Sequence, residues 1–370
     1  MENVASLDNL FLASARARRG KSRRPDVEAW WLRREVEIAA LREELMSGSY
    51  TPGPYRFFTI HTPKYREIAA APFRDRVVHH ALCNFMGPLL ERRFIARSFS
   101  CQVDKGTTAA RECCRKLTNR RRYVLKCDVR KFYDSIDHAV LLAKLADVVR
   151  CPGVMSLINR ILSGYKMTAG AAFFPGDDWL EAARRPRGLP IGNLTSQLWG
   201  NFYLDDLDHR ITGTERHGDY LRYTDDFLIF SDEKDRLWEL RKVVDAELAA
   251  LRLRFAEPKS RLLQTNEGVP FCGFRFLPGL RPRILGATKR RFELRRYLLK
   301  AAGDFKRLSL SVFSWYQFSR EGNTQGLRRA YARWPLDARL KRRRGKASRG
   351  SRRVVEQQRS RESVVVESQQ

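Results

Sequence analysis

No stretch of this 370-residue sequence stays apolar and uncharged for long, and its cysteines form no paired motif. A transmembrane helix needs about 18 or more such residues, and the opening MENVASLDNLF lacks the basic-then-apolar order of a signal peptide. The seven cysteines lie apart without a CxxC pair, and the six histidines show no HExxH or similar spacing. We therefore expect an intracellular, cytoplasmic protein with reduced, packing cysteines and no zinc site.

Acidic residues are also scarce, because 42 Asp and Glu stand against 71 Lys and Arg, a formal net charge of +29. Such a surface suits a polyanionic partner, although charge alone does not separate nucleic acid from an anionic membrane surface. The apolar content of 43% is enough for a sizeable core. The length exceeds that of a typical domain, so we expect two or three subdomains.

Apolar periodicity and the positions of Gly and Pro predict a mixed chain of helices and strands. Residues 1–50 should be helical, with one amphipathic helix ended by Gly48. A helix should begin at Phe73, and a Gly- and Pro-rich loop should follow a helix at 137–149. The other expected elements are strands at 55–60 and 123–129, a helix within 188–211, a hairpin around Thr224, a helix at 233–251, a hairpin at 268–276 and basic helices over 288–333.

Two segments concentrate the basic charge. For RARRGKSRR, residues 16–24, a phosphate contact and a solvated helix face are about equally good interpretations. The tail from Ala338 to Arg353 contains nine Lys or Arg and no acid. Such a segment cannot bury enough apolar surface to fold alone, so we expect disorder unless it is bound.

The stretch YLRYTDDFLIF, residues 220–230, carries two adjacent carboxylates in an apolar, strand-like run. A buried carboxylate is costly unless it is paired or bound to a metal, so Asp225 and Asp226 need a partner. Asp128 ends the apolar run YVLKCD in the same way. A single Asp in a turn more often caps the backbone, but two apolar strands that each carry an uncapped Asp favour a shared metal site.

Carboxylates at adjacent strand ends can hold two divalent ions about 3.5 to 4 Å apart, which activate the attacking oxygen and stabilise the leaving oxygen of a phosphoryl displacement. Mg²⁺ is the expected ion, because it is a hard cation held by one or two carboxylates together with substrate phosphates. The pattern therefore predicts a two-Mg²⁺ phosphoryl-transfer site at Asp128, Asp225 and Asp226.

Several motifs, in this order, resemble those of reverse transcriptases. YTDD is similar to their YxDD box, and CDVRKFYDSI to the motif of their first catalytic aspartate. Between them GLPIGNLTSQ takes the place of a QGxxxSP box, with Ile191 instead of Gln and Gln197 instead of Pro. This variant resembles the reverse transcriptases of diversity-generating retroelements, which copy a template RNA and misincorporate opposite adenine. The likeness extends from about Leu7 to Trp334 and includes TPKYREIAAAPFRDRVVHHAL, EPKSRL, GVPFCGF and NTQGLRRAY.

The resemblance implies an α+β right-hand polymerase with fingers, a palm of antiparallel strands backed by helices, and a helical thumb. The implied domains are an N-terminal extension and fingers at 1–122 with part of the palm interleaved, the palm with the catalytic motifs at 123–284, the thumb at 285–337 and the basic tail at 338–370.

The resemblance also implies roles for single residues. Asp128 and Asp225 would be the metal-binding aspartates, with Asp226 as the third acid in a less direct role. Tyr133 falls where the family places the side chain that blocks a ribose 2′-hydroxyl, and Phe132 beside it is expected in the core. An aromatic wall there would select deoxynucleotides by exclusion.

Further residues would contact the nucleotide and the nucleic acid. Lys64 and Arg66 resemble the fingers cations that hold the incoming triphosphate, and Ile191 would lie near the incoming nucleotide and template base, acting with Gln197. Lys259 matches the lysine proposed to protonate the leaving pyrophosphate, although a salt bridge to Glu257 explains it almost equally well. The thumb helix RRFELRRYLLK would track the template–primer backbone through phosphate contacts from Arg290, Arg291, Arg295 and Arg296.

The implied function is RNA-directed DNA polymerisation, by a bacterial or phage-encoded enzyme with adenine-directed mutagenesis. Its partners would be template RNA, nascent cDNA, deoxynucleoside triphosphates and a small basic accessory variability protein. Another bacterial reverse transcriptase, from a retron, a group II intron or a defence system, would more often retain QGxxxSP. A non-catalytic RNA-binding protein on the same fold explains the charge but leaves the three aspartates without a function. A basic membrane-surface protein fits poorly, because strand-like core motifs interrupt the charged stretches.

Overall fold

The computed structural model describes residues 1–60, 65–165, 173–174, 177–257 and 259–332. The chain divides into two compact units. The first contains Met1–Cys272 and Phe276–Leu280, and the second contains Gly273–Arg275 and Arg281–Gln370. No helix of the described ranges is long and apolar enough to cross a membrane.

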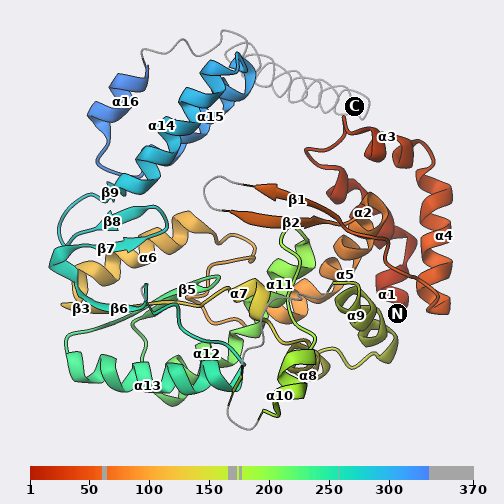
Figure 1. Cartoon of the computed structure of the whole chain (residues 1–370), viewed down its shortest axis with the longest axis horizontal. Helices are drawn as coiled ribbons and strands as arrows, with labels where there is room; N and C mark the ends of the chain where they lie inside the picture. Colours follow the sequence, from red (N-terminus) through yellow and green to blue (C-terminus); the bar gives the residue numbers. More distant parts are fainter. Residues whose placement is uncertain (61–64, 166–172, 175–176, 258, 333–370) are drawn as a thin grey trace, which may run out of the picture. The chain divides into compact units, whose positions relative to one another are not determined.

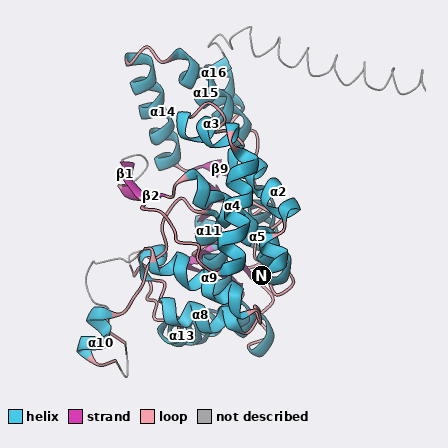
Figure 2. Cartoon of the chain, turned by 90° about the vertical axis from the view of Figure 1, so that its right-hand side faces the viewer, coloured by secondary structure: helices cyan, strands magenta, loops and turns pink. Residues whose placement is uncertain are grey.

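The first unit begins with a group of packed helices, in which α2, α4 and α5 lie side by side (Figure 2). The prediction of one helix ended by Gly48 is wrong in part. Gly48 does end α4 in the left-handed conformation, with φ of 73°, but the chain breaks at Arg33, whose N–H bonds back to Trp30 and Trp31. The break redirects the chain so that Trp31 packs on other helices, which apolar periodicity along one helix does not encode. The helices are α1 (Glu2–Ala5), α2 (Leu7–Arg18), α3 (Pro25–Leu32), α4 (Arg34–Ser47) and α5 (Phe73–Glu91).

A two-stranded hairpin separates α4 from α5. Strand β1 (Arg56–Ile60), which the sequence predicts, pairs antiparallel with β2 (Arg66–Ala70), which it did not. Every residue of β1 is exposed. Figure 1 shows the hairpin extending away from the helices that flank it in the chain.

The centre of the first unit is an antiparallel sheet with strand order β4-β5-β3-β6. Successive side chains of a strand point to opposite faces. One face carries residues such as Leu125, Cys127, Phe227 and Ile229, which share a core with the apolar side of α13 (Lys234–Ala250). Figure 1 shows α13 running along the sheet. The strands are β3 (Tyr123–Asp128), β4 (Tyr220–Tyr223), β5 (Asp226–Ser231) and β6 (Arg261–Gln264).

Helices cover the rest of the first unit. The Gly- and Pro-rich loop predicted after residue 149 is wrong in part, because α9 and α10 form there. Pro152 begins α9 at a first-turn position that tolerates Pro, and the helix buries a row of aliphatic side chains. The predicted α+β class, with an antiparallel sheet backed by helices, is confirmed. The remaining helices are α6 (Thr107–Arg120), α7 (Phe132–Ser135), α8 (His138–Ala146), α9 (Pro152–Ser163), α10 (Trp179–Arg184), α11 (Leu194–Tyr203) and α12 (Asp205–His209).

The second unit has a small core of its own. Phe292 stacks on Trp315 with ring centres 4.3 Å apart, and Leu308 and Val312 pack around them. The basic helices predicted over 288–333 are present as three separate helices. The elements near and within this unit are β7 (Val269–Phe271), β8 (Phe274–Phe276), β9 (Arg283–Ile284), α14 (Gly286–Ala301), α15 (Phe305–Ser319) and α16 (Gln325–Ala332).

The seven cysteines are all free thiols. Cys114 on α6 and Cys127 on β3 are buried among apolar side chains, whereas Cys101 is exposed. Burial raises the pKa of both buried thiols above the usual range. These two cysteines therefore act as small packing residues.

A buried ion pair joins the sheet to the helices. The side chains of Arg222 on β4 and Asp208 on α12 have no exposed surface. Arg222 donates to Asp208 over 2.7 and 2.5 Å, and to the side-chain and main-chain oxygens of Asn201 on α11 over 2.9 and 3.0 Å. Tyr220 donates to the same carboxylate over 2.6 Å. Burial alone would lower the pKa of Arg222, but the Asp208 carboxylate raises it above its usual value.

Replacing Arg222 with Met should destabilise the first unit strongly. Asp208 would then be a buried charge without its cation, which costs about 3–5 kcal/mol. As a control, Arg115→Met removes an exposed pair with Glu112 and should cost less than about 1 kcal/mol. Urea unfolding followed by tryptophan fluorescence measures both. Equal losses of unfolding free energy for the two variants would show that the buried pair stabilises the fold no more than the exposed pair.

Candidate active site

Asp128 and Asp226 face each other at the end of two central strands. They are direct partners in the antiparallel register of β3 and β5, which places their Cβ atoms about 4.5–5.5 Å apart. Strand alternation puts both carboxylates, and Lys126, on the face opposite the α13 core. The structure thus brings together two acids from the strands that the sequence analysis singled out.

Asp225 lies in the turn between β4 and β5. Thr224 before it has a left-handed backbone with φ of 55°, which is unusual for a β-branched residue. Arg222 donates to the Thr224 carbonyl over 3.0 Å. The guanidinium that is buried against Asp208 therefore also holds the strained turn, and strain of this kind concentrates at functional sites.

The three carboxylates influence one another. Burial raises the pKa of Asp225, and the charge of Asp128 adds to that rise. Burial also raises the pKa of Asp226 to about 6, with Lys126 acting against the rise and both other aspartates adding to it. Negative charge is therefore concentrated beyond what the surrounding side chains offset, which is a setting that a cation would relieve.

Lys126 compensates one of the three acids. Its ammonium donates to the two carboxylate oxygens of Asp226 over 2.8 and 3.1 Å, and to the carbonyl of Pro270 on β7 over 3.1 Å. This contact holds the Asp226 side chain toward β7. Both oxygens of Asp226 are thus engaged, whereas Asp225 has no lysine of its own among the described residues.

Lys259 contacts the Asp128 carboxylate. The alternative partner, Glu257, is instead bonded to Arg241 over 2.9 and 3.1 Å. Ser260 anchors the segment, since its hydroxyl accepts from the Asp128 N–H over 3.1 Å and donates to the Asp128 carbonyl over 3.2 Å. The EPKSRL motif is therefore fixed to the end of β3 at the carboxylates.

Tyr133 lies between the carboxylates and α11. Burial raises the pKa of its hydroxyl above the usual range, with Asp225 contributing and Arg66 opposing. A Cβ at Gly200 of α11 would come within 3.1 Å of the Tyr133 ring, so the absence of a side chain there makes room for it. Phe132 beside it is buried in the core, as predicted.

The GLPIGNLTSQ segment packs against the hairpin. Gly192 has φ of 124°, and a Cβ there would lie 3.2 Å from Ile68 on β2, so glycine is required by both backbone and space. Asn193 is buried and donates to the Tyr55 hydroxyl over 3.0 Å. Ile191 is half-buried before this turn, and Gln197 is exposed on α11.

The remaining predicted contacts lie on the hairpin and in the second unit. Arg66 begins β2, is exposed, and acts electrostatically on Tyr133, whereas Lys64 lies outside the described residues. Within the second unit, the predicted cations all lie on α14. Arg296 is half-buried, and the other three are exposed: Arg290, Arg291 and Arg295.

The acids fit a magnesium site that is completed by a substrate. Within the described ranges, no group of three or more His, Cys, Asp or Glu side chains could hold a metal ion by itself. Asp128 and Asp225 offer hard oxygen donors that repel each other, while Asp226 is bonded to Lys126. Mg²⁺ in phosphoryl-transfer sites takes one or two carboxylates and fills its shell with substrate phosphates and water. Two carboxylates therefore suffice for it.

Two residues that the sequence analysis missed shape this site. Lys126 stands two positions before Asp128, and strand alternation places it on the same face, so a lysine in an apolar strand was the available signal. Arg222 stands three positions before Asp225 in a run that is otherwise apolar or aromatic. A charged residue inside a buried strand needs a partner, although Asp208 could not be identified from spacing.

Comparison with known proteins finds bacterial relatives of this chain. The protein YkfC of Escherichia coli K12 is 25% identical over 282 residues, which cover 65% of this chain and 71% of that protein. The group II intron-encoded protein LtrA of Lactococcus lactis is 23% identical over 236 residues, 62% of this chain. The chain spans only 38% of the length of LtrA.

Solved structures and a family match complete the comparison. Apo telomerase from Candida tropicalis superposes with a TM-score of 0.46 at 11% identity, over 61% of this chain and 47% of that chain. Residues 56–276, which include the hairpin, the central sheet and all three aspartates, match the family described as reverse transcriptase (RNA-dependent DNA polymerase). This chain belongs to the reverse transcriptase family.

Proposed function

We propose that the chain is an active RNA-directed DNA polymerase that copies a template RNA into cDNA. The observation that carries the proposal is the strand register that sets Asp128 opposite Asp226, with Asp225 in the adjoining turn. Holding three acids together raises the free energy of the folded state. A scaffold that only bound RNA would gain nothing from them, whereas polymerisation needs a cation at this place.

Each residue of the site has a distinct task in this proposal. Asp128 and Asp225 hold Mg²⁺, and Lys126 keeps Asp226 compensated so that it supports the site from beside it. When bound, two Mg²⁺ ions activate the attacking hydroxyl and stabilise the leaving oxygen. Lys259 contacts Asp128, and its ammonium is placed to give a proton to the departing pyrophosphate.

The nucleotide would lie between Tyr133 and the hairpin. Arg66 and Lys64 would bind the triphosphate through charge-assisted bonds. Tyr133 would exclude a 2′-hydroxyl, and Ile191 with Gln197 would border the base pair. The four arginines of α14 would bind the template–primer backbone without regard to sequence.

We further propose that the chain works in a diversity-generating retroelement, with a small basic accessory protein as partner. The support is the IGNLTSQ variant, in which Ile191 offers an aliphatic surface where a glutamine would offer hydrogen bonds. In the same proposal the fingers lie within 1–122, the palm within 123–284 and the thumb within 285–337, with a basic tail beyond. The similarity to LtrA favours a second candidate, a reverse transcriptase of group II intron type, for which accurate copying is expected.

Replacing Asp225 with Asn should reduce primer extension on RNA at least about 100-fold, because changing a group that supports a metal already costs 10–100-fold. RNA affinity should stay close to that of the wild type, since one neutralised acid leaves the basic surface intact. Extension in Mg²⁺ and RNA binding are measured on the same preparations. Asp245→Asn on α13 is the matched control and should extend normally; near-normal extension by Asp225→Asn would remove the metal assignment.

Replacing Tyr133 with Ala should admit ribonucleotides, because the space of the ring becomes free for a 2′-hydroxyl. Loss of a packing contact of this size changes discrimination by about 10- to 200-fold. Competition between a deoxynucleotide and its ribonucleotide measures it. Tyr133→Phe keeps the ring and should keep the preference, and an unchanged preference in Tyr133→Ala would place the steric gate elsewhere.

Replacing Ile191 with Gln should lower misincorporation opposite template adenine about tenfold, with errors at other bases little changed. Selectivity built from buried polar contacts exceeds the roughly 1–3 kcal/mol that apolar contacts give. One RNA template is copied by both enzymes, with the accessory protein where it is needed, and the cDNA is sequenced. An identical adenine error rate in an active variant would contradict the role proposed for Ile191.

A further inference from the structure

The N-terminal helices hold an alternating stack of arginine and aromatic side chains. The guanidinium carbon of Arg18 lies 4.3 Å from the centre of the Trp31 ring, and that of Arg34 lies 4.5 Å from it. Arg34 also lies 4.9 Å from the centre of the Phe11 ring. The four side chains come from α2, α3 and α4, so tertiary packing builds the stack.

Ring faces, and not acids, hold these two guanidinium groups. Among the described residues, no acid forms an ion pair with Arg18 or Arg34, whereas neighbouring Arg24 and Arg33 pair with Asp26 and Glu37. The Nε of Arg18 is buried without a hydrogen-bond partner in the described part of the chain. A guanidinium carries its five N–H donors in its plane. Stacking therefore fixes the group by its faces and leaves donors at its edge, in the fork that matches a phosphate.

Basic side chains outnumber acids in the surroundings, although Asp26 pairs with Arg24. Residues 16–24 contain six Lys or Arg and no acid. Burial lowers the pKa of Lys21, and the charges of Arg76 and Arg24 lower it further. Burial likewise lowers the pKa of Arg76, with Arg24 adding to the effect. Cations gathered in this way repel one another until an anion lies among them.

We propose that Arg18 and Arg34 form a binding site for backbone phosphates of RNA, outside the candidate active site. Lys21 and Arg24, between α2 and α3, and Arg76 on α5 extend this site. The identification of the polyanion as RNA rests on the proposed function, while the phosphate site itself rests on the stack. Bidentate bonds from Arg to phosphate are charge-assisted and independent of base sequence.

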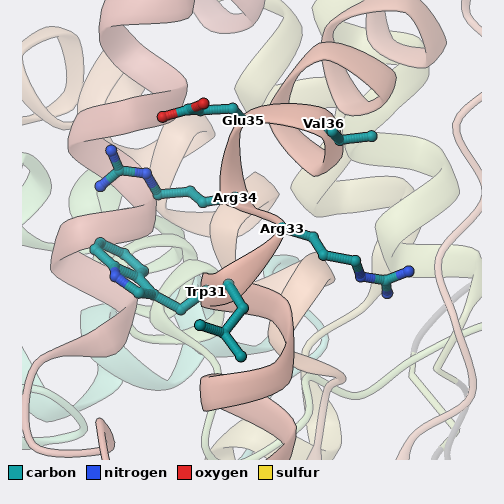
Figure 3. Close-up of a pocket in the computed structure, with 6 residues that line it drawn as sticks. Trp31, Arg33, Arg34, Glu35 and Val36 are labelled. Carbon is teal, nitrogen blue, oxygen red and sulfur yellow. The ribbon is translucent and has the colours of Figure 1, made fainter.

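The other side of the same helix junction provides a control. Figure 3 shows Arg34 beside the Trp31 ring, with Arg33 and Val36 directed away from it. A pocket of about 310 Å³ is lined by residues 31–36. Leu32 and Val36 are its exposed apolar members, and two aliphatic side chains offer little surface to a protein partner. Arg33, which is exposed and paired with Glu37, is the matched residue outside the stack.

The test compares the salt dependence of RNA binding by the full chain. Arg18→Gln/Arg34→Gln removes two stacked cations, and Arg33→Gln/Arg42→Gln removes two exposed ones from the same region. Fluorescence anisotropy with a labelled single-stranded RNA at several KCl concentrations gives the slope of log K against log [salt]. Each phosphate contact with a single strand contributes about 0.7 to that slope. The stacked pair should therefore reduce it by about 1.4, and the control pair by less than half as much.

A variant that keeps the charge tests whether RNA binding needs the planar guanidinium groups or only positive charge. Arg18→Lys/Arg34→Lys keeps both charges but loses the planar groups, so its RNA affinity should fall below that of the wild type. Wild-type affinity in this variant, or a slope loss in Arg18→Gln/Arg34→Gln no greater than in the control pair, would overturn the proposal and leave the surface open to a protein partner.

If the glutamine or lysine variants unfold, the same site can be tested in the wild-type protein. Modification of arginines by phenylglyoxal, mapped by mass spectrometry, should be slowed by RNA at Arg18 and Arg34 and not at Arg33. Equal modification with and without RNA would overturn the site. Because every readout is binding, the outcome is independent of polymerase activity, which the Asp225→Asn experiment tests separately.

Discussion

The turn that carries Asp225 depends on one buried side chain, that of Arg222. Its guanidinium makes hydrogen bonds to Asp208, Asn201 and the Thr224 carbonyl, of which those to Asp208 and Asn201 are buried. Two helices and the turn that carries Asp225 are therefore joined through a single rigid planar group. A lysine could not replace it, because a point-like ammonium cannot serve acceptors in several in-plane directions at once. The cost of burying this charge is offset only when Asp208 is present.

The three aspartates differ in how a neighbouring lysine compensates their negative charge. Lys259 contacts Asp128 from a half-exposed position, so a cation and a nucleotide can displace it at little cost. Lys126 is largely buried and also bonded to Pro270, so its contact with Asp226 persists. Asp225 depends on its turn and has no such partner among the described residues. The chain can thus hold its acids together through these contacts, of which the half-exposed one from Lys259 is the easiest to exchange.

The sequence predicted several of the strands and the order of the motifs because both are local, but it missed β2 and β6. It placed Asp128 and Asp225 at strand ends, whereas Asp226 is the acid that faces Asp128. Gly48 correctly marked a helix end. The break at Arg33 could not be predicted, since the contact of Trp31 with Arg18 on α2 that accompanies it joins separate helices. Glu257 was the only salt-bridge partner that the sequence offered for Lys259, because it is close in the chain, and only the fold brings Asp128 near. Contacts such as Lys126 with Pro270 join residues far apart in the chain, and no spacing rule encodes them.

The carboxylates and the turn after Ile191 are held in place by different contacts. The carboxylates are fixed by hydrogen-bonded charges, whereas Ile191 precedes a glycine turn that is fixed by backbone conformation and by Ile68. Gly192 and Asn193 secure that turn whatever side chain stands at 191. A change at this position should therefore leave the supports of the carboxylates in place. Under the proposed function, this separation would let the residue at position 191 influence fidelity while the arrangement of the carboxylates stays the same.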